Sequence, residues 1–221
     1  MLATQFNGMR AQLNEIHARL QSKIELADAK LRETNSQLMN QSDELRRMNE
    51  ELKRLSITDA LTGLSNRRYL EARLEEEIKR SHRNGSPMSF MMIDVDEFKP
   101  YNDNFGHTEG DRALQIVARC LRETLRGADV AVRYGGEEFS ILLPQTNIKE
   151  AFLTAERVRQ RVEQTEFPNR KVTVSIGVAA CPPKCTLTGL VSSADKALYE
   201  AKRAGRNCVK VFEEEDDDPN S

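Results

Sequence analysis

Acidic side chains occur in two short clusters, each beside an apolar stretch of the chain. Asp94 to Asp96 (Asp-Val-Asp) ends one apolar run, and Gly135 to Glu138 (Gly-Gly-Glu-Glu) precedes another. Paired glycines permit a tight turn and let a bulky ligand approach the backbone closely. Carboxylates at strand ends can converge across a sheet, where they hold Mg²⁺ while water and phosphate oxygens complete its coordination. Taken singly, each cluster also fits a simpler interpretation, as solvated strand-end acids or an ordinary hairpin turn.

A nucleotide substrate also needs cations for its phosphates, and the sequence offers three near these clusters. Lys99 follows the first cluster, and Lys202 and Arg206 lie at the end of the last predicted helix. Each of them alone is equally well explained as a solvated surface charge. The phosphate loop GxxxxGK[ST], the dinucleotide motif GxGxxG and the zinc-protease motif HExxH do not occur in the sequence. Spacing alone therefore favours nucleotidyl transfer with two metal ions held by carboxylates.

The segments that would position these groups alternate between extended and helical patterns. Apolar and β-branched runs predict strands at 89–95, 129–134, 139–144, 171–178 and 208–212. Helical periodicity and good helix formers predict helices at 67–82, 111–125, 149–164 and 187–204. Because a glycine turn joins the second and third strands as a hairpin, the sheet cannot be wholly parallel. We predict an α/β (α+β) sandwich with one mixed, largely antiparallel central sheet of about five strands flanked by helices.

A long helix is predicted ahead of this domain, since Leu13–Leu55 contains neither glycine nor proline and consists mainly of helix formers. Its a/d seam repeats every seven residues through Ile24, Leu31, Leu38, Leu45 and Leu52, interleaved with Ala27, Thr34, Gln41, Met48 and Leu55. An extra spacing of four residues between Leu20 and Ile24 predicts a stutter, where a supercoil locally unwinds. This narrow, long stripe favours a parallel coiled-coil homodimer over a helix folded back on its own domain.

Composition limits the class of protein. The 221 residues, 38% of them hydrophobic, have room for one globular domain and an appendage. The predicted division is a coiled-coil helix at 1–56, the globular domain at 57–212 and a disordered acidic tail at 213–221. A net charge of -2 gives no general attraction to nucleic acid polymers or anionic membranes. Without a signal sequence or a run of about 18 apolar residues, a cytoplasmic protein with no membrane segment is expected. The four cysteines are expected to be reduced in that compartment. CPPKC at 181–185 has no nearby histidine and is poorly spaced for zinc.

Several longer motifs resemble those of one family. RYGGEEF at 133–139 resembles the signature of the GGDEF family of diguanylate cyclases, in its GGEEF form. DALTGLSNRR at 59–68 resembles the opening DxLTGLxNRR of that family, and IDVDEFKPYNDNFGHTEGD at 93–111 resembles its central block. TVSIGV at 173–178 and ADKALYEAKRAGRN at 194–207 follow in family order. The resemblance covers the whole predicted globular part.

This resemblance implies a fold like that of nucleotidyl cyclases and polymerase palm domains, with half of a composite active site on each protomer. It implies that Asp94 and Glu137, with the main-chain carbonyl of Val95, hold two Mg²⁺ or Mn²⁺ ions per active site. Glu138 is the implied candidate general base, although a metal-bound hydroxyl needs no dedicated base. The implied catalytic residues are Asp94, Gly135, Gly136, Glu137 and Glu138.

The resemblance also implies the contacts to the nucleotide. Asn102 and Asp111 match the pair that reads guanine, so GTP is expected in preference to ATP. The implied phosphate contacts are the side chains of Lys99, Lys202 and Arg206 and the main-chain amides of Glu97 and Phe98. Glu97 departs from the family, in which an aromatic residue is frequent at this position. Because the implied contact is through the backbone, Glu97 is expected to leave activity intact, although a carboxylate beside a triphosphate could weaken its binding.

A further motif resembles an inhibitory product site of the family. Arg126-Gly127-Ala128-Asp129 forms an RxxD sequence with five residues between Asp129 and Gly135. The resemblance implies that this arginine and aspartate bind the guanine and phosphate of cyclic di-GMP, with help from Arg157 on the following helix. The alternative is a surface ion pair at a helix end and a strand start.

The prediction is a diguanylate cyclase that condenses two GTP into cyclic di-GMP and two pyrophosphates across a homodimer interface, with feedback inhibition by its product. The coiled coil would set the geometry of the two half-sites under the influence of an upstream input, which is either a sensor domain of a longer protein or a separate partner of a short form. The alternatives are a receptor for cyclic di-GMP and a cyclase that acts within one nucleotide or on mixed GTP and ATP. The intact metal-binding and phosphate-binding residues argue against the receptor, and the guanine-reading pair argues against the other cyclase.

Overall fold

A computed structural model describes residues 2–55 and 57–213. The chain divides into two units, helix α1 (Leu2–Leu55) and the domain that begins at Ile57, and each is considered by itself. The helix predicted at Leu13–Leu55 is confirmed, although it begins earlier than predicted. The five residues of the main apolar stripe, Ile24, Leu31, Leu38, Leu45 and Leu52, are 57–68% exposed. Pairing of this stripe with a second helix stays a prediction.

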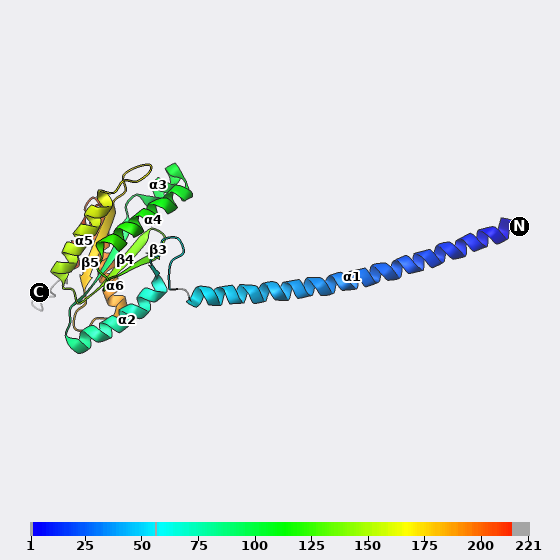
Figure 1. Cartoon of the computed structure of the whole chain (residues 1–221), viewed down its shortest axis with the longest axis horizontal. Helices are drawn as coiled ribbons and strands as arrows, with labels where there is room; N and C mark the ends of the chain where they lie inside the picture. The colour runs from blue at the N-terminus through cyan, green and yellow to red at the C-terminus, as the bar shows by residue number, and fades with distance from the viewer. Residues whose placement is uncertain (1, 56, 214–221) are drawn as a thin grey trace, which may run out of the picture. The chain divides into compact units, whose positions relative to one another are not determined.

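The domain contains five further helices and one six-stranded sheet (Figure 1). The helices are α2 (Arg67–Asn84), α3 (Phe98–Phe105), α4 (His107–Thr124), α5 (Ile148–Glu163) and α6 (Leu187–Arg203). The strands are β1 (Ser65–Asn66), β2 (Met88–Val95), β3 (Val130–Gly135), β4 (Glu138–Pro144), β5 (Val174–Ala180) and β6 (Val209–Val211). All five predicted strands and four predicted helices are present, whereas β1 and α3 were not predicted.

The sheet has the order β1-β3-β4-β2-β5-β6. Strand β2 pairs antiparallel with β4 and β5, and β3 pairs antiparallel with β4. The two outer strands, β1 and β6, run parallel to their neighbours. The predicted mixed, largely antiparallel sheet is therefore confirmed.

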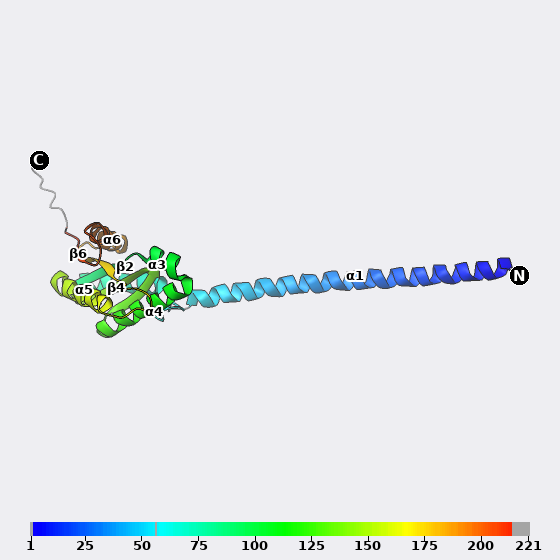
Figure 2. The same cartoon turned by 90° about the horizontal axis from the view of Figure 1, so that it is seen from above.

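Helices cover both faces of the sheet, and alternate residues of the central strand β2 divide between them. Met91 and Ile93 belong to the core formed with α4 and α5, whereas Phe90 and Met92 belong to the core formed with α2 and α6. Figure 2 shows α6 on one side of β2 and β4, and α4 and α5 on the other. Every residue of β2 is buried, as expected of a central strand with helices on both faces. The same alternation assigns Asp94 to the face covered by α6.

Polar side chains fix where three of these helices begin. Asn66 and Thr186 each accept a backbone N–H in the first turn, at the starts of α2 and α6. At α5, Asn147 and Glu150 form a reciprocal capping box. Such caps satisfy N–H groups that have no partner within the helix. The Thr186 cap thus fixes the residue at which α6 begins. It thereby also determines which residues lie at the opposite end of the helix.

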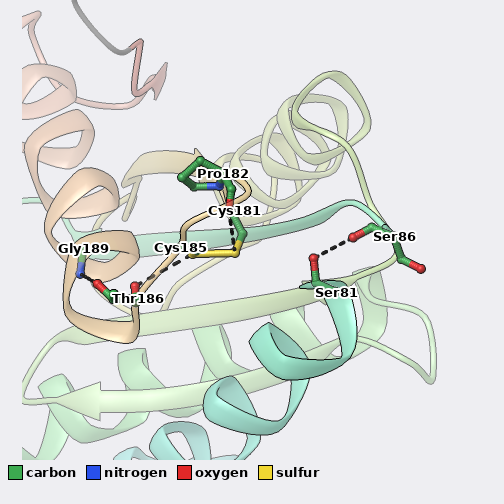
Figure 3. The surroundings of a disulfide bond; sticks show 7 residues. All are labelled: Ser81, Ser86, Cys181, Pro182, Cys185, Thr186 and Gly189. Atoms are coloured by element: carbon green, nitrogen blue, oxygen red, sulfur yellow. Dashed lines mark hydrogen bonds between the residues drawn. A yellow bond between two sulfur atoms is a disulfide. The ribbon is translucent and has the colours of Figure 1, made fainter. Parts of the chain in front are cut away.

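The connection between β5 and α6 contains a disulfide between Cys181 and Cys185 (Figure 3). The expectation that all four cysteines are reduced is therefore wrong for this pair, whereas Cys120 and Cys208 are free thiols. A turn in which the N–H of Cys185 donates to the carbonyl of Pro182 brings the chain back on itself. It leaves the two cysteine Cα atoms 5.3 Å apart, within the range that a disulfide spans. The expectation rested on the cellular compartment, which carries no information about this turn.

No helix within residues 2–55 and 57–213 is long and apolar enough to cross a lipid bilayer. The predicted disordered tail lies outside the described residues, apart from Glu213.

Candidate functional site

The two acidic clusters meet at one end of the sheet. Asp94, near the end of β2, lies directly opposite Glu138, the first residue of β4, in the antiparallel register. Glu137 lies in the turn between β3 and β4, and its main-chain carbonyl accepts the N–H of Val95 at 3.3 Å. Residues about forty positions apart in sequence are therefore held together by strand pairing.

The turn that carries the second cluster is braced by the opening motif of the domain. Gly136 has a φ of 49°, in the left-handed region that glycine adopts without strain. The guanidinium of Arg133 donates to the carbonyl of Gly136 at 2.9 and 3.1 Å. It also lies 3.3 Å from both carboxylate oxygens of Asp59, which in turn accepts the N–H and hydroxyl of Thr62. Sequence analysis found both motifs but assigned no role to Arg133 or Asp59.

Asp94 is largely buried and has other carboxylates nearby. Its side chain is 12% exposed, and its carboxylate pairs with the ammonium of Lys202 on α6 at 2.8 Å. Burial raises the pKa of Asp94, Lys202 lowers it in part, and the nearby carboxylates of Glu137 and Asp96 raise it again. Burial, and next the charge of Asp94, likewise raise the pKa of Glu138. One ammonium therefore faces several carboxylates, and an added cation would relieve their repulsion.

The available donors fit a hard divalent cation that is also bound by its substrate. Asp94 and Glu137 offer carboxylate oxygens, and Val95 offers a carbonyl oxygen. Among the described residues, no three or more His, Cys, Asp or Glu side chains form a group that could hold a metal by themselves. A partial set of oxygen donors suits Mg²⁺ or Mn²⁺, which retain water and take phosphate oxygens as further ligands.

Asp96 lies in the same acidic cluster but binds protein groups. Its buried carboxylate accepts the hydroxyls of Thr173 at 2.7 Å and Ser175 at 2.6 Å. It also accepts the backbone N–H of Asn207 at 3.0 Å. Asp96 therefore joins the end of β2 to the start of β5 and to the loop after α6. The sequence places this acid in the first cluster but predicts no role for it, because residue type does not tell which way a side chain points.

The loop after α6 is held in an unusual conformation. Gly205, Arg206 and Asn207 have φ values of 106°, 63° and 46°. Non-glycine residues adopt such values only where surrounding contacts hold them. The Asn207 side chain donates to Glu163 at 3.0 Å and accepts from Arg159 at 3.0 Å, both on α5. These α5 residues, which sequence analysis did not identify, therefore position the loop that carries Arg206.

The cations expected to bind phosphate lie near the acidic clusters. Lys202 is next to Asp94, as described, and the guanidinium of Arg206 lies 3.2 Å from the carboxylate of Glu97. Lys99 is exposed on α3. No side chain caps the start of α3, which leaves the amides at Phe98 open to an anion.

The pair expected to read guanine lies on α3 and α4. The Oδ1 atom of Asn102 is buried and has no hydrogen-bond partner among residues 2–55 and 57–213. A Cβ atom at Gly110 would overlap this oxygen, so glycine leaves the space that the amide occupies. Asp111 follows Gly110 and is exposed. Because a buried acceptor without a partner is costly, the Asn102 oxygen suits a ligand N–H.

The expected product site is formed in part. The guanidinium of Arg126 lies 3.0 Å from the carboxylate of Asp129 and also donates to the carbonyl of Pro144 at 3.0 Å and to the hydroxyl of Thr146. The side chain of Asp129 is almost fully buried. Arg157 is on α5 and makes no hydrogen bond to Arg126 or Asp129 within the described part of the chain. The roles assigned to the site residues stay predictions.

Comparison with known proteins gives one family. Residues 56–208 match the family model "Diguanylate cyclase, GGDEF domain". Diguanylate cyclase DgcP of Pseudomonas aeruginosa is 42% identical over 160 residues, which are 71% of this chain and 24% of that protein. The chain therefore spans about a quarter of the length of this curated relative.

Solved structures of similar proteins share the architecture. The coiled coil and GGDEF domain of DgcB from Caulobacter crescentus, in complex with c-di-GMP, has a TM-score of 0.69 at 29% identity, covering 80% of this chain and 98% of that one. Diguanylate cyclase SiaD of Pseudomonas aeruginosa, in complex with its activator SiaC, has a TM-score of 0.68 at 37% identity, covering 95% of this chain and 82% of that one.

Replacing Glu163 should change stability in a pH-dependent way. Hydrogen bonds from Asn207, Lys171 and Arg159 lower the pKa of Glu163 to about 2. A carboxyl group with a lowered pKa stabilises the fold above its unfolded value of 4.5, and this stabilisation is lost as the pH falls towards 2. Glu163→Gln should therefore lower the free energy of unfolding at pH 7 by about 1 kcal/mol, since solvent screens a side chain that is 28% exposed. Urea unfolding at a series of pH values measures this difference.

The two proteins should converge in stability between pH 4.5 and 2. Glu166→Gln is the matched control, because Glu166 is exposed and lies on the same segment. A Glu163→Gln difference that does not change with pH would contradict the assignment.

Proposed function

The chain belongs to the GGDEF-domain family of diguanylate cyclases, and from this premise we propose that it condenses two GTP molecules into cyclic di-GMP and two pyrophosphates. The observation that carries the proposal is the convergence of Asp94, Glu138 and Lys202 at the end of the sheet where the glycine turn lies. In the proposed reaction each 3′-oxygen attacks the α-phosphorus of the nucleotide on the opposite protomer. Positioning and charge stabilisation supply most of the rate enhancement.

Asp94, Glu137 and the carbonyl of Val95 are the groups that would hold two Mg²⁺ or Mn²⁺ ions per active site. Such ions, when bound, neutralise triphosphate charge and lower the pKa of the attacking hydroxyl. The surroundings of Asp94 support this assignment, because its burial and the charges of Glu137 and Asp96 raise its pKa and a divalent cation would offset both effects. Lys202, now 2.8 Å from Asp94, would be free to turn towards a phosphate oxygen.

Asn102 and Asp111 are proposed to read the guanine base. The buried, unpartnered Oδ1 of Asn102 would accept an N–H of guanine, and a carboxylate at Asp111 would accept others. Adenine offers a different pattern of donors and acceptors, so GTP should be preferred to ATP. Lys99, Lys202 and Arg206, with the amides of Glu97 and Phe98 at the start of α3, would bind the triphosphate.

Glu138 is the proposed general base for the 3′-hydroxyl. Its position directly opposite Asp94 in the strand register keeps it beside the proposed metal ligands. Since a metal-bound hydroxyl can lose its proton without a dedicated side chain, Glu138 is assigned this role by position alone.

Removing either proposed metal ligand should abolish turnover. Asp94→Asn and Glu137→Gln should each lower the rate of cyclic di-GMP formation at least about a hundredfold, because neutral amides hold divalent ions poorly. The rate is measured by chromatography of products from GTP and Mg²⁺, with competition by ATP to test nucleotide preference. Glu123→Gln is the control, because Glu123 is an exposed acid on α4 that pairs with Arg161.

Activity surviving in both variants would contradict the metal assignment. An unchanged protein that makes no cyclic di-GMP but binds it would instead be a receptor.

The apolar stripe on α1 is proposed to pair with the same stripe of a second copy. Leu31, Leu38 and Leu45 recur at heptad spacing and are exposed. A parallel coiled coil would bring two domains together and so complete the composite site. The polar seam positions Thr34 and Gln41 weaken the pairing, and an upstream input could then shift it between registers.

Disrupting this stripe should make activity depend more strongly on protein concentration. Leu38→Lys places a charge in the seam, so it should shift the monomer–dimer equilibrium towards monomer and lower specific activity at low concentration. Met39→Lys is the matched control, because Met39 is the neighbouring exposed residue and lies outside the seam. Analytical ultracentrifugation and product formation are measured over the same concentrations. Equal dimerisation of the two variants would contradict the proposed interface.

Arg126 and Asp129 are proposed to bind the product as an inhibitor, with Arg157. The 3.0 Å ion pair keeps the guanidinium and carboxylate together for a guanine and a phosphate. The complex of a DgcB fragment with c-di-GMP supports a role for this product as a ligand in the family.

Variants of the product site should escape inhibition. Arg126→Ala and, independently, Arg157→Ala should raise the concentration of cyclic di-GMP needed for half-inhibition at least about tenfold, because each removes a charge-assisted contact. Arg157→Ala serves as the second variant because Arg126 also donates to the carbonyl of Pro144, so Arg126→Ala removes a contact within the protein as well. Arg119→Ala on α4 provides the control for loss of one positive charge. Unchanged inhibition in both variants would contradict the proposed site.

A further inference from the structure

The side chain of Glu97 has one described contact. Glu97 is the N-cap residue of α3, but its side chain makes no capping hydrogen bond. Its carboxylate lies 3.2 Å from the Nε atom of Arg206, and the side chain is half exposed. Glu97 therefore neutralises one of the cations proposed to bind the triphosphate.

The backbone at this position is held without the Glu97 carboxylate. Its main-chain carbonyl accepts the guanidinium of Arg170 at 2.6 Å and the N–H of Tyr101 at 3.0 Å. On the other side, the N–H of Arg206 donates to the carbonyl of Ala201 at 3.1 Å. Both backbones therefore keep their contacts when the side chain at Glu97 changes.

We propose that Glu97 sets the affinity of this site for GTP by competing with the triphosphate for Arg206. This inference rests on the proposed function. A phosphate oxygen and the Glu97 carboxylate bind the same guanidinium, that of Arg206. The nucleotide must therefore displace the Glu97 carboxylate before its phosphate can contact Arg206 fully. The carboxylate that remains beside the phosphates also repels them.

The ion pair between Lys202 and Asp94 differs from the pair between Arg206 and Glu97 in what happens when the nucleotide binds. Lys202 pairs with Asp94, which would acquire a divalent ion as a new counter-charge when the nucleotide binds. Glu97 is not a proposed metal ligand, so its repulsion of the phosphates is not offset by a divalent ion in the complex. Affinity for the nucleotide is consequently lower than the three phosphate-binding cations alone would give.

The test is equilibrium binding of a GTP analogue with a methylene group between the α- and β-phosphorus, which cannot release pyrophosphate. Titration calorimetry with Mg²⁺ compares the unchanged protein with Glu97→Gln, a substitution that keeps side-chain length. The variant should bind the analogue about threefold to tenfold more tightly, the range expected for an exposed ion pair together with a nearby repulsion. Added salt should narrow this difference, because it screens both effects.

Glu200→Gln is the matched control. Glu200 is an exposed acid that pairs with Arg203 at 3.5 Å, so its replacement changes the net charge equally without freeing a proposed phosphate contact. It should leave the dissociation constant within about twofold, because an exposed carboxylate that pairs with no proposed phosphate contact is largely screened by solvent. In an Arg206→Gln background, the gain from Glu97→Gln should shrink to the part due to repulsion alone.

Equal or weaker binding by Glu97→Gln would overturn the inference, as would an undiminished gain in the Arg206→Gln background. If the unchanged protein makes cyclic di-GMP while Glu97→Gln binds no more tightly, the inference fails and the proposed function stands. An unchanged protein that neither binds the analogue nor makes product would overturn both.

Discussion

The geometry of the site depends on one buried carboxylate, that of Asp96. A buried charge is costly unless hydrogen bonds replace the water that it loses. Asp96 has three such bonds, from the hydroxyls of Thr173 and Ser175 and from the N–H of Asn207. These donors come from the start of β5 and from the loop after α6. They are thereby fixed beside the end of β2, where Asp94 lies, so one charge aligns three segments that are far apart in sequence.

Around this centre, acids and cations of the site neutralise one another. Lys202 pairs with Asp94, and Arg206 pairs with Glu97. A highly charged ligand therefore replaces the carboxylate partners of these cations, and does not bind to cations that were unpaired before. The net electrostatic energy of binding is the energy of the ligand–cation contacts less that of the carboxylate–cation contacts that they replace. An affinity judged from the number of cations alone would therefore be too high.

Long apolar runs made most of the sheet predictable, because a central strand such as β2 is buried on both faces. The acidic clusters were also identifiable, since their motifs are local in sequence. Helix α3 was not, because it is short, contains Pro100 and forms with Phe98 and Tyr101 packed in the core. The role of Asp96 and the approach of Cys181 to Cys185 depend on side-chain direction and on a turn, which composition and periodicity do not encode.

The sheet ends in very short strands: β1 has two residues and β6 has three. A long, exposed outer strand offers a row of unpaired backbone groups on which another chain can build, and such growth leads to aggregates. A domain that meets a second copy of itself, as proposed for this one, is at particular risk of that outcome. Here the outer strands offer too few groups for a continuous sheet to form between copies. Two domains that meet in the proposed dimer could therefore separate again without joining their sheets.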